Sequence, residues 1–151
     1  MLRVGYLIFT TASTNKFYSE LYATLYKDLM DKFDIIKDIF DKNFKTFMDL
    51  FKTSEYVDPE ENYEEFCKVN KKNDERRAMS MFLVYLMKNK IVSRDAIMDT
   101  ALQLQDMMTE FVKIKEKRKH VEELTENIFI IVTCACEILY KHDDWETVLV
   151  N

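Results

Sequence analysis

Two stretches of the chain decide its fold: Ser13-Thr-Asn-Lys-Phe-Tyr-Ser-Glu-Leu-Tyr-Ala-Thr-Leu-Tyr-Lys-Asp-Leu-Met30 and Asp74-Glu-Arg-Arg-Ala-Met-Ser-Met-Phe-Leu-Val-Tyr-Leu-Met-Lys-Asn-Lys-Ile91. Each has a polar start and an apolar stripe at helical spacing, and a second helical pattern follows soon after. This pattern is typical of antiparallel helix pairs packed side by side. Stacks of such pairs normally bind other molecules and do not transform them.

The composition predicts an all-α domain. The 151 residues include one Gly and one Pro, so almost nothing interrupts helices, whereas a sheet protein needs many more turn residues. The length fits one domain, residues 1–151. The formal net charge of −5 argues against a general attraction to nucleic acid or to anionic membranes. No apolar run is long enough to span a bilayer, so we expect no membrane partner.

The cysteines indicate a reducing compartment. Cys67, Cys134 and Cys136 are odd in number and show no secreted disulfide framework, so we expect a cytoplasmic protein. The apolar segment 4–12 is short and has no clear cleavage site, which argues against a signal peptide. Lys outnumbers Arg by 17 to 5, a bias typical of A+T-rich genomes such as those of protists, parasites and large DNA viruses.

The first helix pair follows an N-terminal segment. Ser13 or Thr14 is a suitable N-cap for its first helix. The apolar stripe of that helix recurs every four residues and comprises Phe17, Leu21, Leu25, Leu29 and Phe33. Tyr18, Tyr22, Tyr26 and Met30 run beside it, so the predicted apolar face is wide. A second helix, from 34 to about 53, needs a partner to cover its apolar face. That face comprises Ile36, Ile39, Phe40, Phe44, Phe47, Met48 and Phe51.

Start and stop signals divide the rest of the chain. Asp58 at the N-cap and Pro59 at the first helical position predict a helix start, and the polar run 70–74 predicts a break. Ser93 caps a later helix, and a dense charge run lies at 113–120. The predicted segments are, in order, 1–12 (N-terminal segment), 13–54 (helix pair), 58–72 (inserted helix), 73–112 (helix pair), 119–141 (last helix) and 142–151 (tail).

The pairs begin near Ser13, Asn73 and His120, which is about the spacing of HEAT-type helical repeats once the inserted helix is allowed for. The sequence therefore predicts an all-α, HEAT-like stack of antiparallel helix pairs. This α-solenoid would have about two and a half repeats, the last helix being nearly apolar all round between 128 and 135.

No residue pattern predicts catalysis. Neither His120 nor His142 belongs to a ligand set with acceptable metal spacing, and the chain has no Gly-rich phosphate loop and no zinc pattern. The paired acids at 60–61 and 143–144 are more typical of helix ends than of acid–base catalysis. We therefore expect a non-enzyme without cofactor or metal.

Aromatic and basic residues give candidate binding surfaces. A tyrosine stripe at 18, 22 and 26 fits a stacking platform for RNA bases or a docking face, although packing against a neighbouring helix is the favoured interpretation. Basic clusters at 68–77 and 113–119 fit contacts to RNA phosphates, but their interleaved acids fit a solvated face equally well. The candidate residues are Lys16, Tyr18, Tyr22, Lys71, Lys72, Arg76, Arg77, Lys115, Lys117 and Arg118.

Four segments in order resemble the middle domain of eukaryotic translation initiation factor 4G, a HEAT-like scaffold. They are the opening helix 15–26, the aromatic helix 40–51, the basic-then-apolar helix 76–92 and the acid-led helix 122–134. The third is the most specific, because Phe82-Leu-Val-Tyr-Leu86 stands where Phe-Ile-Gly-Glu-Leu is typical of the family. It lacks the family's Gly. The resemblance covers most of the chain.

The resemblance implies a translation-initiation scaffold that binds a DEAD-box helicase of the factor 4A type, with RNA as a further candidate partner. The family usually has about five helix pairs, and about two and a half are visible here. Both ends of the stack would then lack neighbours. An alternative therefore stays open: a structural or assembly protein that self-associates through uncapped ends and has no role in translation.

Overall fold

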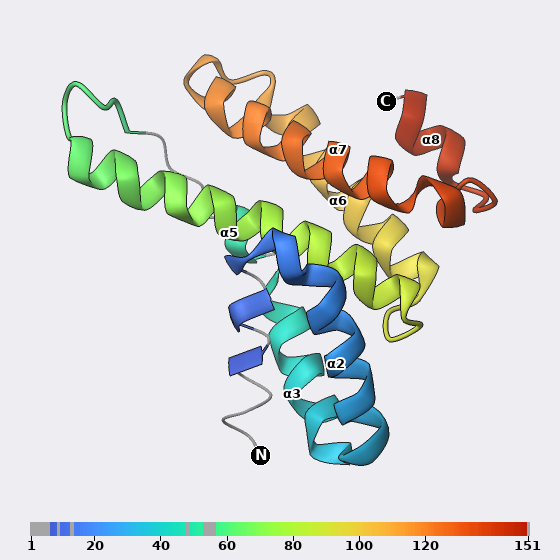
Figure 1. Ribbon diagram of the computed structural model, residues 1–151. Helices are drawn as coiled ribbons and strands as arrows, with labels where there is room; N and C mark the ends of the chain where they lie inside the picture. The colour runs from blue at the N-terminus through green and yellow to red at the C-terminus, as the bar shows by residue number, and fades with distance from the viewer. Residues whose placement is uncertain (1–6, 9, 13, 48, 53–56, 151) are drawn as a thin grey trace.

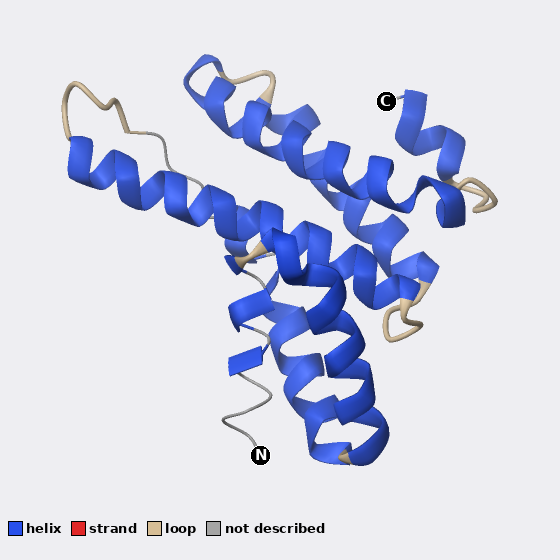
Figure 2. Ribbon diagram, in the orientation of Figure 1, coloured by secondary structure: helices blue, strands red, loops and turns tan. Residues whose placement is uncertain are grey.

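The computed structural model describes residues 7–8, 10–12, 14–47, 49–52 and 57–150. Every regular element in these ranges is a helix, so the all-α prediction is confirmed for this part of the chain (Figure 1, Figure 2). The elements are η1 (Lys16–Tyr18), α2 (Ser19–Lys32), α3 (Asp34–Phe47), α4 (Asp49–Lys52), α5 (Tyr63–Lys88), α6 (Arg94–Phe111), η2 (Lys115–Lys117), α7 (Arg118–Leu139) and α8 (Trp145–Val150).

The long helix α5 is the element on which the others are assembled. The hairpin of α2 and α3 crosses α5, and the hairpin of α6 and α7 packs against α5 through α7 (Figure 1). Although α5 and α6 are consecutive, α6 packs mainly on α7 and only lightly on α5. The segment 73–112, predicted as a helix pair, is therefore not a closely packed pair. Its second helix pairs with the helix that follows.

The predicted break at 70–74 is wrong, because α5 runs without interruption from Tyr63 to Lys88. The Lys, Asn and Asp residues of this run are polar but compatible with a helix. They lie in the half of α5 that is mostly exposed, where Asn70, Lys71 and Lys72 reach water while Asn73 and Asp74 have arginine partners. Lys68 adds support by pairing with two acids one turn before it, at 3.1 and 3.2 Å. The predicted inserted helix 58–72 and the helix after it are one element.

The start of α5 lies later than predicted. The side chain of Asp58 accepts a hydrogen bond from the backbone N–H of Glu60 at 2.9 Å, which makes a turn around Pro59. Asn62 is the N-cap instead, because its side chain accepts from the N–H of Glu65 at 3.1 Å. The Asp-Pro signal was therefore a turn signal, and the helix begins with the next capping residue.

The C-terminal half of α5 is buried on nearly all sides, because both hairpins contact it. Its buried residues besides Arg76 are Ala78, Met79, Ser80, Phe82, Leu83, Val84, Leu86 and Met87. Tyr26 of α2 links the first hairpin to this half, with ring centroids 6.4 Å from Phe82 and 6.0 Å from Phe40 of α3. Burial, reinforced by the charge of Asp41, raises the pKa of Tyr26 to about 12. The tyrosine therefore stays protonated within the core.

Only part of the wide apolar face predicted for the first helix is buried in α2. Ser19, Ala23 and Tyr26 are its buried residues, and two of these are small. Small side chains let one helix approach another closely, so α2 places this face against α5 although the leucines on another face are more apolar. Three members of the predicted stripe are instead exposed, by 85% for Phe17, 63% for Leu21 and 40% for Leu25. We call these three residues the α2 row.

The remaining elements agree with the predictions in part. Ser93 caps α6, because its Oγ accepts from the N–H of Ala96 at 3.1 Å. Of the second-helix face, Ile36, Ile39, Phe40 and Phe51 are buried. The middle of α7 is not buried all round, since Phe129 is 64% exposed. The end of the chain, predicted as a tail, contains the short helix α8.

Some expectations lie outside the described residues. These include Ser13 as an N-cap candidate, most of the N-terminal segment, Met48 of the second-helix face, and the end of the first pair at 53–54. The other N-cap candidate, Thr14, is wrong, because Asn15 caps η1 by accepting from the N–H of Phe17 at 3.2 Å. Phe47 is helical in its backbone, and its side chain is not described.

The orientation of α2 gives the first prediction. Replacing Leu21 by Ala should change the free energy of unfolding by less than about 0.5 kcal/mol, because the side chain is mostly in water. Replacing the buried Tyr26 by Ala should cost about 3 kcal/mol or more. Urea unfolding followed by circular dichroism measures both. A larger loss for the Leu21→Ala variant than for Tyr26→Ala would mean that α2 buries Leu21 and not Tyr26.

Candidate binding site between α5 and α7

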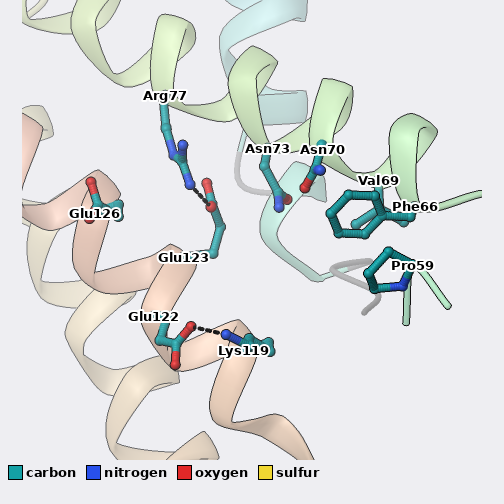
Figure 3. Close-up of a pocket in the computed structure, with 10 residues that line it drawn as sticks. All are labelled: Pro59, Phe66, Val69, Asn70, Asn73, Arg77, Lys119, Glu122, Glu123 and Glu126. Carbon is teal, nitrogen blue, oxygen red and sulfur yellow. Dashed lines mark hydrogen bonds and ion pairs between the residues drawn. The ribbon is translucent and has the colours of Figure 1, made fainter. Parts of the chain in front are cut away.

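A cleft of about 360 Å³ lies between the first turns of α5 and the first turns of α7 (Figure 3). Apolar side chains gather at one end, beside the turn that precedes α5, and charged side chains face one another at the other end. Two asparagines of α5 lie between these ends. The lining residues are Pro59, Phe66, Val69, Asn70, Asn73, Arg77, Lys119, Glu122, Glu123 and Glu126. We call this site the α5–α7 cleft.

An ion pair between Arg77 and Glu123 joins the two walls. Nη2 of Arg77 donates to Oε2 of Glu123 at 2.6 Å, with the Glu123 side chain 5% exposed and that of Arg77 36% exposed. Burial raises the pKa of Glu123, although the hydrogen bond and charge of Arg77 oppose this shift. Burial also works against the charge on Arg77, but the hydrogen bond and charge of Glu123 outweigh it and raise the pKa of Arg77. Arg77 therefore favours the ionised form of Glu123, whereas the guanidinium itself is always charged.

The ion pair continues into the core as a hydrogen-bond chain. Nδ2 of Asn127 donates to Oε1 of Glu123 at 3.0 Å, and Oγ of Ser80 donates to Oδ1 of Asn127 at 2.8 Å. Ser80 and Asn127 are fully buried. Because a buried polar group costs free energy unless it is hydrogen-bonded, this chain favours one register of α5 against α7.

Arg76 is used inside the protein, contrary to its place among the candidate binding residues. It is 3% exposed, and its Nε donates to the backbone carbonyl of Leu50 in α4 at 2.6 Å. Its Nη1 also donates to Oδ1 of Asn73. Burial lowers the pKa of Arg76, while the charges of nearby acids oppose that shift. The carbonyl that binds Arg76 is distant in sequence, so a count of local charges did not reveal this role.

The other candidates in the first half of the chain are partly brought together. Lys16 and Arg77 line a second cleft of about 510 Å³ between η1 and α5. Tyr18 is 53% exposed and stands edge-on to Tyr22, at 6.4 Å between ring centroids. Tyr22 packs partly against the core, as the packing interpretation of the tyrosine stripe expected. The side chains of Lys71 and Lys72 are exposed on α5.

The basic cluster before α7 is partly engaged within the molecule. Nζ of Lys117 lies 3.7 Å from the ring centroid of Phe111, a cation–π contact. Nε of Arg118 lies 3.4 Å from Oε1 of Glu122, while Lys115 is exposed. The acids of α7 therefore reduce the positive charge that this cluster offers to an RNA backbone.

Sequence reasoning missed the carboxylates of the cleft. Glu123 precedes Asn127 and Ile131 at intervals of four, so it belongs to the buried face of α7. An acid on a buried face needs a cation from another element, and that signal was present in the sequence. The partner was not identifiable, because Arg77 lies 46 positions away.

Comparison of the chain with protein-family models, curated proteins and solved structures finds no match. Within the described ranges, no group of three or more His, Cys, Asp and Glu side chains is arranged to hold a metal ion. None of the described helices is both long and apolar enough to cross a membrane. The description of the site therefore rests on the positions and contacts of its own residues.

The ion pair gives the second prediction. The variant Arg77→Met should lose about 2 kcal/mol of unfolding free energy at pH 7, because it removes the cation that is hydrogen-bonded to the buried Glu123 and leaves only the charge of Arg76 to oppose the carboxylate. The loss is smaller than for a fully buried pair, since water reaches part of Arg77. The exposed Lys72→Met is the matched control and should change stability by less than about 0.5 kcal/mol.

The pH dependence of the unfolding free energy tests whether Glu123 is the group responsible for the lost stability. A carboxyl with a raised pKa in the folded state stabilises the fold while it is protonated. The unfolding free energy of Arg77→Met should therefore fall as pH rises from about 4.5 through the raised pKa of Glu123. Adding Glu123→Gln should remove this fall. A flat profile for Arg77→Met, with wild-type stability at pH 7, would show that the pair does not join the helices.

Proposed function

We propose that this chain is a non-enzymatic helical scaffold that binds a partner protein through the α2 row, and that the partner is a DEAD-box helicase of the factor 4A type. The observation that carries the proposal is the exposure of three large apolar side chains at four-residue intervals on η1 and α2. Single exposed apolar residues are normal on a protein surface, whereas a contiguous set is typical of an interaction site.

The α2 row is held on a fixed support. Another face of the same helix is buried through Ser19, Ala23 and Tyr26, so the helix cannot turn the row inward without exposing Tyr26. Anchors that recur every four residues are typical of helix-mediated recognition, in which a partner surface accepts one side of a helix. Tyr18 extends the apolar surface beside the row, being 53% exposed.

The choice of a helicase rests on the resemblance to the factor 4G middle domain. The α2 row falls within 15–26, the first of the four resembling segments. A scaffold of this kind would act in the cytoplasm. It would bind the helicase in a way that makes the closed state of the helicase more populated, and the helicase itself would perform the ATP chemistry. In this proposal the helix hairpins are HEAT-like units, and RNA is a further partner at the exposed Lys16, Lys71 and Lys72.

Self-assembly is the second candidate function. Large apolar side chains are also exposed far from α2 in sequence, with Phe129 at 64%, Tyr140 at 55% and Val150 at 83%. A structural protein that packs against copies of itself would cover such residues. The two functions differ in which molecule covers the α2 row.

The third prediction tests the proposed function by titrating the chain with a purified factor 4A-type helicase and following binding and ATPase rate together. Wild type should bind saturably and stimulate the ATPase. The double variant Leu21→Glu and Leu25→Glu should bind at least about tenfold more weakly, because charges replace two apolar anchors. The matched control is Val112→Glu, which changes a 65% exposed apolar residue outside the row and should bind as wild type.

The same samples distinguish helicase binding from self-assembly. Absence of binding at about tens of micromolar, from a folded helical sample, would reject the helicase as partner. Concentration-dependent self-association in sedimentation experiments, abolished by the double variant and kept by Val112→Glu, would then assign the α2 row to assembly.

A further inference from the structure

The short helix α8 is attached to the rest of the molecule over a small area. After α7 ends at Leu139, the chain turns through the mostly exposed segment 140–144 and continues into α8 (Figure 1). Within α8, Val148 is 5% exposed, whereas Leu149 and Val150 are 56% and 83% exposed. A helix of six residues is not stable by itself in water, so α8 stays folded because it is docked on another helix.

That other helix is α6, against which α8 mainly packs. Two side-chain contacts join them. Nε2 of Gln105 donates to the backbone carbonyl of Val148 at 2.7 Å, a buried hydrogen bond. Nε2 of His142, just before α8, lies 3.2 Å from Oδ1 of Asp95. The Asp95 side chain is 80% exposed, so water competes with this second contact.

The surface that α8 covers is one side of α6. Met98 and Leu102 stand between Asp95 and Gln105 at intervals of three and four residues, so all four share one side of the helix. Met98 is fully buried, and Leu102 packs partly against the core. This side of α6 is therefore an apolar strip with a polar residue at each end. We call it the α6 strip.

The docked position of α8 leaves a buried acceptor without a partner. Gln105 is 6% exposed, and Oε1 of its amide has no hydrogen-bond partner among the described residues, although Nε2 of the same amide binds α8. A buried acceptor without a partner costs free energy, and water can supply a donor once α8 moves away from this amide. The burial of Val148 in α8 is therefore opposed by the unpaired oxygen of Gln105.

We propose that α8 is a displaceable lid, and that the α6 strip binds, in place of α8, a helix of a partner protein with an aromatic and a branched apolar residue three positions apart. The lid itself shows the chemistry that fits, because Trp145 and Val148 have this spacing and both pack on the core. A partner helix that also donates to Oε1 of Gln105 satisfies the acceptor that α8 leaves unpaired. The α6 strip is separate from the α2 row, and its binding does not require a helicase.

Trp145 is the only tryptophan of the chain, so its fluorescence reports on the lid. In a urea titration its emission should shift to longer wavelength at a lower urea concentration than the loss of far-ultraviolet circular dichroism, because the lid opens before the other helices unfold. Coincident transitions would overturn the inference.

A second experiment titrates a fluorescein-labelled peptide of residues 142–150 into the full chain. The variant Val148→Asp removes the buried anchor of the lid and should bind the peptide at least about tenfold more tightly than wild type, in which the tethered α8 competes for the strip. The matched control is Val150→Asp, which changes an 83% exposed residue of the same helix and should bind as wild type.

Equal affinities of Val148→Asp and wild type, or no binding to Val148→Asp at about 1 mM, would contradict the proposal. Loss of the helical signal in Val148→Asp would also contradict it, since the other helices do not need a displaceable lid to fold. Wild-type dimers that the peptide dissociates would show that α8 of a second copy fills the strip instead. The Leu21→Glu and Leu25→Glu variant should bind the peptide as wild type does, so failure of helicase binding and failure of the lid are distinguishable.

Discussion

The fold depends on covering the C-terminal half of α5. Its apolar side chains, such as Phe82 and Val84, lie on different faces of the helix, so no single neighbouring helix can remove them all from water. The α2–α3 hairpin contacts this half through Tyr26, and the second hairpin contacts α5 through α7. The N-terminal half is more polar and is left largely uncovered. The α5–α7 cleft lies along this uncovered half.

Polar interactions then fix the register of the helices that pack against α5. The Arg77–Glu123 pair and the Ser80–Asn127 hydrogen bond hold α5 against α7, while Arg76 holds α4 against α5. A buried ion pair often gains little stability over an apolar pair of the same shape. Its main contribution here is to make other registers of the helices costly, since they would leave buried charges without partners. Arg77 also lines the second cleft, so it connects the surroundings of the α2 row with the α5–α7 cleft.

Sequence patterns predicted features that depend on local chemistry. The cap at Ser93 and the burial of Phe40 with its neighbours are of this kind. The orientation of α2 was not predictable from apolarity, because close packing favoured Ala23 over Leu21. The continuity of α5 was missed because polarity at 70–74 was taken as a break, although it reflects exposure. The cleft depends on residues of α5 and α7 that meet only in the folded chain, and no local pattern identifies such a meeting.

The measurement that tests this account most directly is the distance between spin labels at positions 64 and 88 of α5. The native cysteines Cys67, Cys134 and Cys136 would first be replaced. Over 24 residues a continuous helix rises about 36 Å, so the account predicts one narrow distribution near that value once the label linkers are included. A shorter or two-peaked distribution would mean that the helix bends at 70–74, and the cleft and its ion pair would then lack their common wall.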